Sequence, residues 1–314
     1  MAMMRYATNR LVMFAGGLAL ILMTSFFAIY RLPGDPARMI LGPRASAQSI
    51  EEFRRSAGLS DPVATQFERF VARVATLDLG ESLAYRRPVV ALLRERMGQT
   101  LQLIGCAFLT LLFFAVLLPI GLRAVGLGLV DNGLRALWTG FSAAPPYVLA
   151  LLTLTIFAGF LRVLPAVFEP DRIACWIAAS FVLAAYPTAL ASRLFHDSLT
   201  SALLSDYATR ARAQGFSEAA ILLREALVNA LTAPVSAMAN GLAYFFTGTF
   251  FVEVAFGVGG IGSLTYEAIQ NKDMTVLAGV CLLFAVVISA LSAVLDLAQH
   301  LLNPRLRRSH EWQG

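Results

Sequence analysis

The sequence is poor in charged residues and contains almost no lysine. Only 14% of its 314 residues are Asp, Glu, Lys or Arg, against about 25% in an ordinary soluble domain. Lys272 is the single lysine, and it lies between Asn271 and Asp273. A phosphate-binding Walker A loop needs Gly-x-x-x-x-Gly-Lys-Ser/Thr, so the chain contains no nucleotide site of that kind. The composition also excludes an ordinary soluble enzyme.

Cysteine and histidine are equally scarce, with three of each. Cys106, Cys175 and Cys281 each lie inside an apolar segment, and an odd number at such spacing indicates neither a disulfide framework nor a metal site. No nucleophile, base or metal cluster converges in the sequence, which argues against a membrane-embedded enzyme. We therefore expect no catalytic residues, no bound cofactor and no metal in this chain.

What the sequence has in abundance is long uncharged runs, since 58% of its residues are apolar and its mean hydropathy is +0.68. A helix needs about 20 apolar residues to cross a bilayer. The sequence predicts an all-α membrane protein with six spans, at about residues 11–31, 98–122, 136–160, 173–194, 230–252 and 274–298. The first is interpreted as a retained helix, because Arg31-Leu32-Pro33 follows it in place of a signal-peptide cleavage site.

The interiors of these spans lack carboxylates and histidines. Ion-driven transporters usually need such groups at membrane depth, so secondary active transport is disfavoured. His196 and Asp197 lie at the inner end of the fourth span, and Asp296 and His300 at that of the sixth. A structural role near the membrane surface is the favoured interpretation of all four.

Arginine is concentrated in alternate loops, which predicts that both termini are cytoplasmic. The net charge of +5 is then explained by the arginines of the loops expected on the cytoplasmic side. No basic cluster lies on a soluble face, so nucleic acid is not expected as a partner. Residues 32–96 form an outer cap, with two short amphipathic helices expected at 50–57 and 67–74. The cap either shields the spans or contacts a soluble partner.

The inner segment 193–230 is the most structured polar stretch of the chain. Residues 205–214 are compatible with a helix, and Gly215 stands where a left-handed helix end is favoured. Ser217 is a candidate N-cap for a second helix, with Glu218 in its first turn. The sequence predicts two helices joined at a glycine corner, placed between a cytoplasmic partner and the membrane.

Gly257, Gly259 and Gly262 match the dinucleotide pattern Gly-x-Gly-x-x-Gly after the strand-like run 250–256. This pattern is meaningful only in a strand, turn and helix unit with an acidic residue about 20 positions further on. The short outer loop between spans five and six leaves no room for a soluble sheet. A tightly packed re-entrant loop is the favoured interpretation.

These motifs together resemble a known family, the permease subunits of binding-protein-dependent ABC importers of the dipeptide, oligopeptide and nickel type. The resemblance is carried by five segments in order: Leu32-Pro33-Gly34-Asp35-Pro36, then Asp78-Leu79-Gly80-Glu81-Ser82 with Arg87-Pro88-Val89, then Asp206-Tyr207 with Ala211-Arg212-Ala213-Gln214-Gly215, then Glu253 and Phe256 with Gly260-Ile261-Gly262, and finally Asn303-Pro304-Arg305.

The resemblance implies a type I importer permease of the inner (cytoplasmic) membrane of bacteria. The implied partners are a second permease subunit, two cytoplasmic ATPase subunits that bind ATP and Mg, and an extracytoplasmic substrate-binding protein. The segment 193–230 corresponds to the EAA loop that docks on the ATPase. Its implied coupling residues are Asp206, Tyr207, Arg210, Ala211, Arg212, Ala213, Gln214, Gly215, Ser217 and Glu218. Gln214 replaces a usual Lys, which leaves Arg210 and Arg212 to supply the charge of the loop.

The implied substrates are peptides or related small solutes, with nickel or metal chelates and opines as alternatives, and the binding protein sets much of the choice. An ATP-independent channel or scaffold is a further alternative, which leaves the ordered inner corner unexplained. Candidate residues of the translocation path or outer gate are Pro146, Tyr147, Tyr186, Glu253, Phe256, Gly260 and Gly262. Bending of the helices is the favoured role for the prolines.

Overall fold

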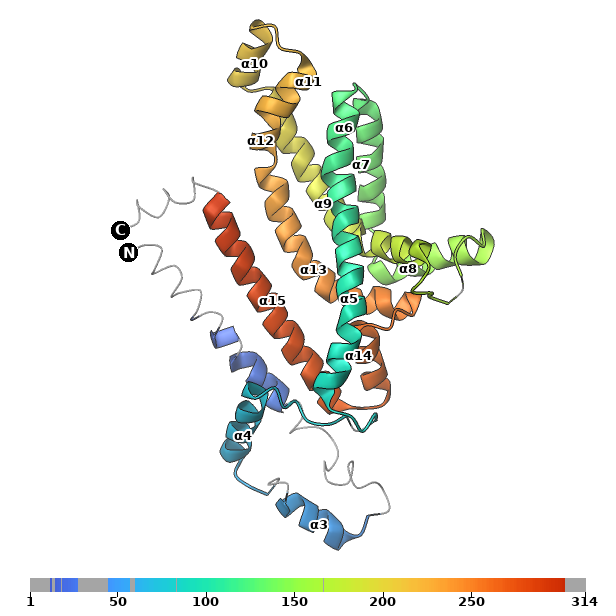
Figure 1. The fold of residues 1–314 in the computed structure, drawn as a ribbon, viewed down its shortest axis with the longest axis vertical. Coiled ribbons are helices and arrows are strands. Elements are labelled where there is room, and N and C mark those ends of the chain that lie inside the picture. The colour runs from blue at the N-terminus through green and yellow to red at the C-terminus, as the bar shows by residue number, and fades with distance from the viewer. Residues whose placement is uncertain are drawn as a thin grey trace, which may run out of the picture. The chain divides into compact units, whose positions relative to one another are not determined.

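The computed structural model describes residues 12, 15–17, 19–27, 45–56, 60–82, 84–165 and 167–302. All regular structure in these ranges is helical, apart from one isolated antiparallel bridge between Glu81 and Pro88 (Figure 1). The predicted all-α class is therefore confirmed for the described chain. The motifs at 32–36 and 303–305 lie outside the described residues, as does part of the first expected span.

Three described helical segments are long and apolar enough to cross a membrane. The first, Val89–Ala124, joins α5 (Val89–Leu112), the π-helical η1 (Phe113–Leu117) and α6 (Leu118–Ala124). The others are α9 (Ile173–Leu203) and the Met274–Val294 part of α15 (Met274–Leu302). Both α5 and α9 extend beyond the charge-free runs, because arginine and glutamate are good helix formers that a search for uncharged stretches leaves out.

Two further candidate spans are bent pairs. The first comprises α7 (Gly128–Ser142) and α8 (Pro146–Leu154) with η2 (Thr155–Phe160), at 107°. Pro145 precedes α8 and Pro146 is its first residue, so the proline pair ends one helix and starts the next. The expected span 136–160 is thus two helices, and the predicted role in bending is confirmed for Pro145 and Pro146. The second pair, Gly241–Phe256 and Ile261–Gln270, bends by 70°.

The chain divides into two compact units, residues 1–98 with 264–293 and residues 99–263 with 294–314. In the second unit α9 is the central helix and packs on α7, α8, α12 (Leu227–Ala230) and α13 (Thr232–Phe256) (Figure 1). Glycines allow α13 to approach α9 closely, because a Cβ at Gly241 would lie 3.3 Å from Pro187 and one at Gly248 would lie 2.8 Å from Leu183. The helix that carries the inner corner is therefore held in the core of this unit.

In the first unit, the two amphipathic cap helices expected from the sequence are present as α3 (Ala47–Ser56) and α4 (Val63–Ala75). Phe26 lies against Phe67 and Phe70 of α4, with ring centroids 5.4 and 5.7 Å apart. Such aromatic pairs add about 0.5–1.5 kcal/mol beyond the apolar area they bury. The apolar side of α4 is therefore anchored on the N-terminal helical segment.

The segment 78–82 forms a tight turn directly after α4. Asp78 accepts hydrogen bonds from the backbone N–H of Gly80 at 3.0 Å and from Nε of Arg73 at 2.9 Å. These two contacts, the bond from Gly80 first, lower the pKa of Asp78. Gly80 has φ +82°, a conformation that a side chain disfavours. The residue types of the motif are therefore those that the turn requires.

The same turn is fastened to the start of α15. Asp273 is buried and accepts from Ser82 Oγ at 2.5 Å and from the N–H of Ala84 at 3.0 Å. Its other oxygen caps α15 by accepting from the N–H of Val276 at 3.2 Å. The Tyr85 hydroxyl donates to Glu267, which raises the pKa of Tyr85. One buried carboxylate thus joins residues almost 200 positions apart in the sequence.

Candidate functional site: inner corner and outer turn

The inner corner, residues 206–221, has the geometry expected from its sequence. It consists of α10 (Asp206–Ala213), Gly215 and α11 (Glu218–Ile221). Gly215 has φ +83°, its N–H donates to the Arg212 carbonyl at 3.0 Å, and the N–H of Phe216 donates to the Ala211 carbonyl at 3.2 Å. This pair of bonds is a Schellman motif, so the left-handed helix end predicted at Gly215 is confirmed.

The predicted cap of the second helix is also present. Ser217 Oγ accepts a hydrogen bond from the N–H of Ala220 at 3.3 Å, which satisfies one of the unpaired donors of the helix start. From α11 the chain continues through η3 (Leu222–Ala226), α12 and α13. The corner therefore connects the end of α9 with the helix that runs back through α13.

An ion pair closes the corner across its glycine. Arg212 donates to both carboxylate oxygens of Glu218, at 2.7 and 3.1 Å, and to the backbone carbonyl of Leu203 at 3.0 Å. The hydrogen bonds between them lower the pKa of Glu218 and raise the pKa of Arg212. Arg212, one of the two arginines expected to supply the charge of the loop, is thus engaged inside the corner.

A small apolar core supports the corner. Ala208, Ala211 and Ile221 are buried together, and Leu203 and Tyr207 pack against them. A neighbouring cluster, also contacted by Leu203 and Tyr207, joins α9, η3, α12 and α6 through buried Phe195, Leu199, Ala202, Leu222, Ala226 and Ala230 and the partly buried Ile120 and Ala124. Displacement of the corner would therefore be transmitted to α6 and α9 by direct packing.

Phe216 is a candidate contact residue that the motif comparison did not identify. It directly follows Gly215, and 46% of its surface is exposed. Exposed aromatic side chains are enriched where proteins bind one another. In the sequence, this contact residue could have been recognised as a phenylalanine in an otherwise polar loop.

The outer turn, residues 253–263, is organised by a buried glutamate. Glu253 is fully buried in α13, and its two oxygens accept from Thr100 Oγ1 at 2.7 Å, from the N–H of Gly262 at 2.7 Å and from the N–H of Ser263 at 3.2 Å. Thr100 Oγ1 in turn accepts from the N–H of Ile261 at 2.8 Å. Three donors at the start of α14 (Ile261–Gln270) are thereby satisfied.

The glycines of the turn are explained by close approach. A Cβ at Gly260 would lie 2.4 Å from Glu253 Oε2, and one at Gly262 would lie 2.6 Å from the Cα of Phe250. The run 250–256 is the end of helix α13, so its strand-like composition was misleading. Glu253 directly follows the expected span 230–252, and the bent candidate span, Gly241–Phe256 with Ile261–Gln270, includes it.

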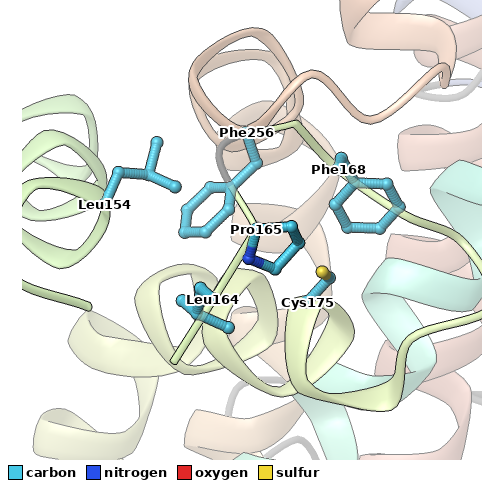
Figure 2. A pocket seen from close by; sticks show the side chains of 6 residues that line it. All are labelled: Leu154, Leu164, Pro165, Phe168, Cys175 and Phe256. Carbon is cyan, nitrogen blue, oxygen red and sulfur yellow. The ribbon is translucent and has the colours of Figure 1, made fainter. Parts of the chain in front are cut away.

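Phe256 does not face an open path in this structure. It is buried and lines an apolar cavity of about 10 Å³ with Leu154, Leu164, Pro165, Phe168 and Cys175 (Figure 2). That volume is about the size of one water molecule. Phe256 therefore packs the end of α13, and its proposed role at an outer gate remains a prediction.

The remaining path candidates lie on two helices. Pro146 and Tyr147 begin α8, and Tyr147 is 46% exposed. Tyr186 lies in the middle of α9, is 48% exposed and packs against Tyr244 of α13 in a tilted arrangement, with a centroid distance of 5.1 Å. Tyr244 was not identified from the sequence, because only the packing of α13 on α9 brings the two rings together.

Comparison with known proteins identifies the chain. Residues 115–308 match the family described as binding-protein-dependent transport system inner membrane component, and residues 3–104 match its N-terminal family. The chain belongs to this family. The permease is 31% identical over 306 residues to the glutathione transport system permease protein GsiC of Salmonella paratyphi A, covering 97% of this chain and 99% of the relative. It is 30% identical over 315 residues to GsiC of Escherichia coli K12, with the same coverage.

A solved structure supports the fold of the permease. An amino acid ABC transporter crystallised with histidines aligns with a TM-score of 0.52 at 15% identity, covering 67% of this chain and 94% of that one. The resemblance to the importer permeases seen in the sequence is therefore confirmed. The chain is a permease subunit of a binding-protein-dependent ABC importer, and it resides in the inner membrane.

Proposed function

We propose that the permease is one of two membrane-spanning subunits of an ATP-driven importer of small peptides. Two relatives that match 97% of the chain are glutathione transport permeases, and glutathione is a tripeptide. The arrangement includes six spans with both termini in the cytoplasm, two ATPase subunits on the inner side and a binding protein on the outer side. ATP and Mg belong to the ATPase subunits.

The inner corner is the observation that carries this proposal. It is a small, internally satisfied unit whose Arg212–Glu218 pair and apolar core leave Phe216 exposed. A rigid corner with an exposed aromatic side chain suits insertion into a cleft on a partner. Closure of the ATPase subunits would displace the corner, and packing against α9 and α6 would carry that displacement into the membrane helices.

We further propose that Tyr186 and Tyr244 line the translocation path. Both lie near the middle of long apolar helices, and no hydrogen bond to either hydroxyl is found among the described residues. A tyrosine hydroxyl facing lipid at that depth would be unsatisfied. A water-filled path supplies the missing partner.

Gly215→Pro tests the coupling role. Proline fixes φ near −65° and removes the N–H that bonds the Arg212 carbonyl. In proteoliposomes containing the permease, its copurifying ATPase and second permease subunits and the binding protein, we expect loss of ATP-dependent glutathione uptake with normal membrane insertion. Gly215→Ala is the matched control, because it keeps the N–H and adds only about 1–2 kcal/mol of left-handed strain. Wild-type uptake by the proline variant would disprove the coupling role.

A further inference from the structure

A charged network lies beside the inner corner and is not part of the motifs that identified the family. Nε of Arg123, at the end of α6, donates to Asp131 Oδ2 at 2.9 Å, and a terminal amino group of Arg123 donates to Nδ1 of His196 on α9. His196 Nδ1 lies 3.8 Å from Asp131 Oδ2. One arginine therefore connects three helices, α6, α7 and α9.

The network is largely enclosed. Asp131 is 2% exposed, and the side chains of Arg123 and His196 are 16% and 23% exposed. Asp131 Oδ1 is buried and has no hydrogen-bond partner in the described chain. Such an acceptor costs about 1–3 kcal/mol unless it finds a donor. Asp131 is therefore ready to accept one more hydrogen bond.

The network adjoins the apolar cluster that supports the inner corner. Arg123 precedes Ala124, and His196 follows Phe195, and both Ala124 and Phe195 belong to that packing. In the second unit, α6, α7 and α11 lie at the same end (Figure 1). The α6–α7 hairpin is thus linked to the helix that leads into the corner by apolar contacts and by this polar bridge.

We propose that Arg123, Asp131 and His196 form a second coupling link, which ties the α6–α7 hairpin to the inner corner and which protonation of His196 releases. Because an arginine has no acceptor, the bond from Arg123 requires an unprotonated Nδ1. A proton on Nδ1 removes the acceptor and places a second positive charge beside Arg123.

The bond from Arg123 to His196 depends on pH, because it needs an unprotonated Nδ1. The link is intact while His196 is neutral and is lost as the pH falls through the pKa of the ring. The charged groups around the ring are Arg123 on α6, Asp131 and Arg135 on α7, and Asp197 on α9 itself. We therefore expect the population of the link to be lower at pH 5.5 than at pH 7.5.

The first test measures the link in the purified full-length permease and needs no transport. Spin labels at Leu127, between α6 and α7, and at Ser201 on α9 report the distance between hairpin and helix, with the three native cysteines replaced by alanine. In the wild-type background the distance distribution should be narrow at pH 7.5 and broaden or lengthen at pH 5.5. An unchanged distribution would overturn the proposal.

Three variants separate titration of His196 from general destabilisation. His196→Gln keeps an acceptor for Arg123 that does not titrate, so the distribution should stay narrow at both pH values. Arg123→Gln should give the broad distribution at both. Glu169→Gln, which removes an exposed carboxylate that is not among the groups around the ring, should respond to pH as the wild type does. A pH response that persists in His196→Gln shows that the histidine is not the switch.

The second test, which rests on the proposed function, is uptake of radiolabelled glutathione by the assembled importer at an inner-face pH of 7.5 and 5.5. We expect lower uptake by the wild type at pH 5.5 than at pH 7.5, and little difference between the two pH values in His196→Gln. Absence of ATP-dependent glutathione uptake at both pH values, with the spectroscopic response present, would refute the proposed function and leave the link standing. Equal wild-type uptake at both pH values would show that the link does not control coupling.

Discussion

Glu253 shows how one buried side chain determines a whole turn. Both of its oxygens accept hydrogen bonds, and the donors come from Thr100 and from the first residues of α14. A carboxylate next to a helix N-terminus is favoured by the peptide dipoles. Gly260 and Gly262 are required because any side chain there would overlap the glutamate or the backbone of α13.

Replacement of Glu253 by Ala should destabilise the permease strongly. The N–H groups of Gly262 and Ser263 and the Thr100 hydroxyl would lose their partner, at about 1–3 kcal/mol for each donor left unpaired. Glu253→Gln should cost less, since its amide oxygen still accepts. Thermal unfolding in detergent measures both, with Glu169→Ala, an exposed glutamate, as the control expected within about 0.5 kcal/mol of wild type. Equal stability of all three variants would contradict this role.

Two glycines of the outer turn should respond differently to alanine. At Gly257 the φ of +77° is the obstacle and the space is open, so strain of about 1–2 kcal/mol is expected. At Gly262 the added Cβ would lie 2.6 Å from the Cα of Phe250. Because this neighbour is a backbone atom, the backbone of one of the two segments would have to move. We therefore expect a lower unfolding temperature for Gly262→Ala than for Gly257→Ala. The opposite order would show that the turn adapts freely.

At the level of elements, the inner corner is held by several interactions of different kinds. The Schellman bonds fix the direction of the chain at Gly215, the Ser217 cap starts α11, and the Arg212–Glu218 pair spans the gap between the helices. The pair is exposed, so its contribution to stability should be modest and reduced by salt. Its role is to fix the orientation of two short helices.

The corner should loosen in acid. The pKa of Glu218 is lowered by Arg212, so the pair is intact above the ordinary pKa of glutamate, about 4.3, and is lost as the pH falls through the lowered value. The mobility of a spin label at Gln214 should rise at that point. Glu218→Gln should show the higher mobility already at neutral pH, while Arg210→Gln should behave as wild type. If Glu218→Gln left the mobility of the label at Gln214 unchanged, the role of the Arg212–Glu218 pair in holding the corner would be contradicted.

Phe216 should matter for assembly and little for folding. Because the side chain is half exposed, Phe216→Ala should leave the unfolding temperature within a few degrees of wild type. Copurification of the ATPase subunits should fall markedly. Leu77→Ala, an exposed apolar residue of the outer cap, is the control and should retain them. Undiminished copurification by the Phe216 variant would place the contact elsewhere on the corner.

At the level of the whole molecule, the distribution of charge determines the proposed topology. The described chain contains three uninterrupted candidate spans and two bent pairs. The remaining one of the six proposed spans is the N-terminal segment, at about residues 11–31. The arginine-rich loops alternate along the chain with the charge-poor ones, which predicts that the inner corner is cytoplasmic and the outer cap is not.

Labelling of single cysteines with a membrane-impermeant maleimide tests this topology. In a background with Cys106, Cys175 and Cys281 replaced by alanine, a cysteine at Leu77 should react in intact spheroplasts. One at Gln214 should react only in inverted membrane vesicles. Reaction of both positions from the same side would exclude the proposed arrangement.

The sequence by itself determined the helical class, the cap helices and the local geometry of the inner corner. Each follows from short-range rules: the length of uncharged runs, the spacing of apolar residues, and the conformational freedom of glycine next to a serine cap. The family of ABC importer permeases was also accessible, because five short motifs occur in order. These signals are local in the sequence, so they can be recognised without knowledge of the packing.

Only the tertiary structure showed which side chains meet. The Ser82–Asp273 bond, the Glu253–Thr100 anchor, the Tyr186–Tyr244 pair and the Arg123–Asp131–His196 bridge each join residues far apart or on different helices. Helix α13 continues beyond the charge-free run 230–252, because a buried carboxylate such as Glu253 is tolerated once donors from another element satisfy it. The sequence indicated which residues were unusual, and packing decided what each of them binds.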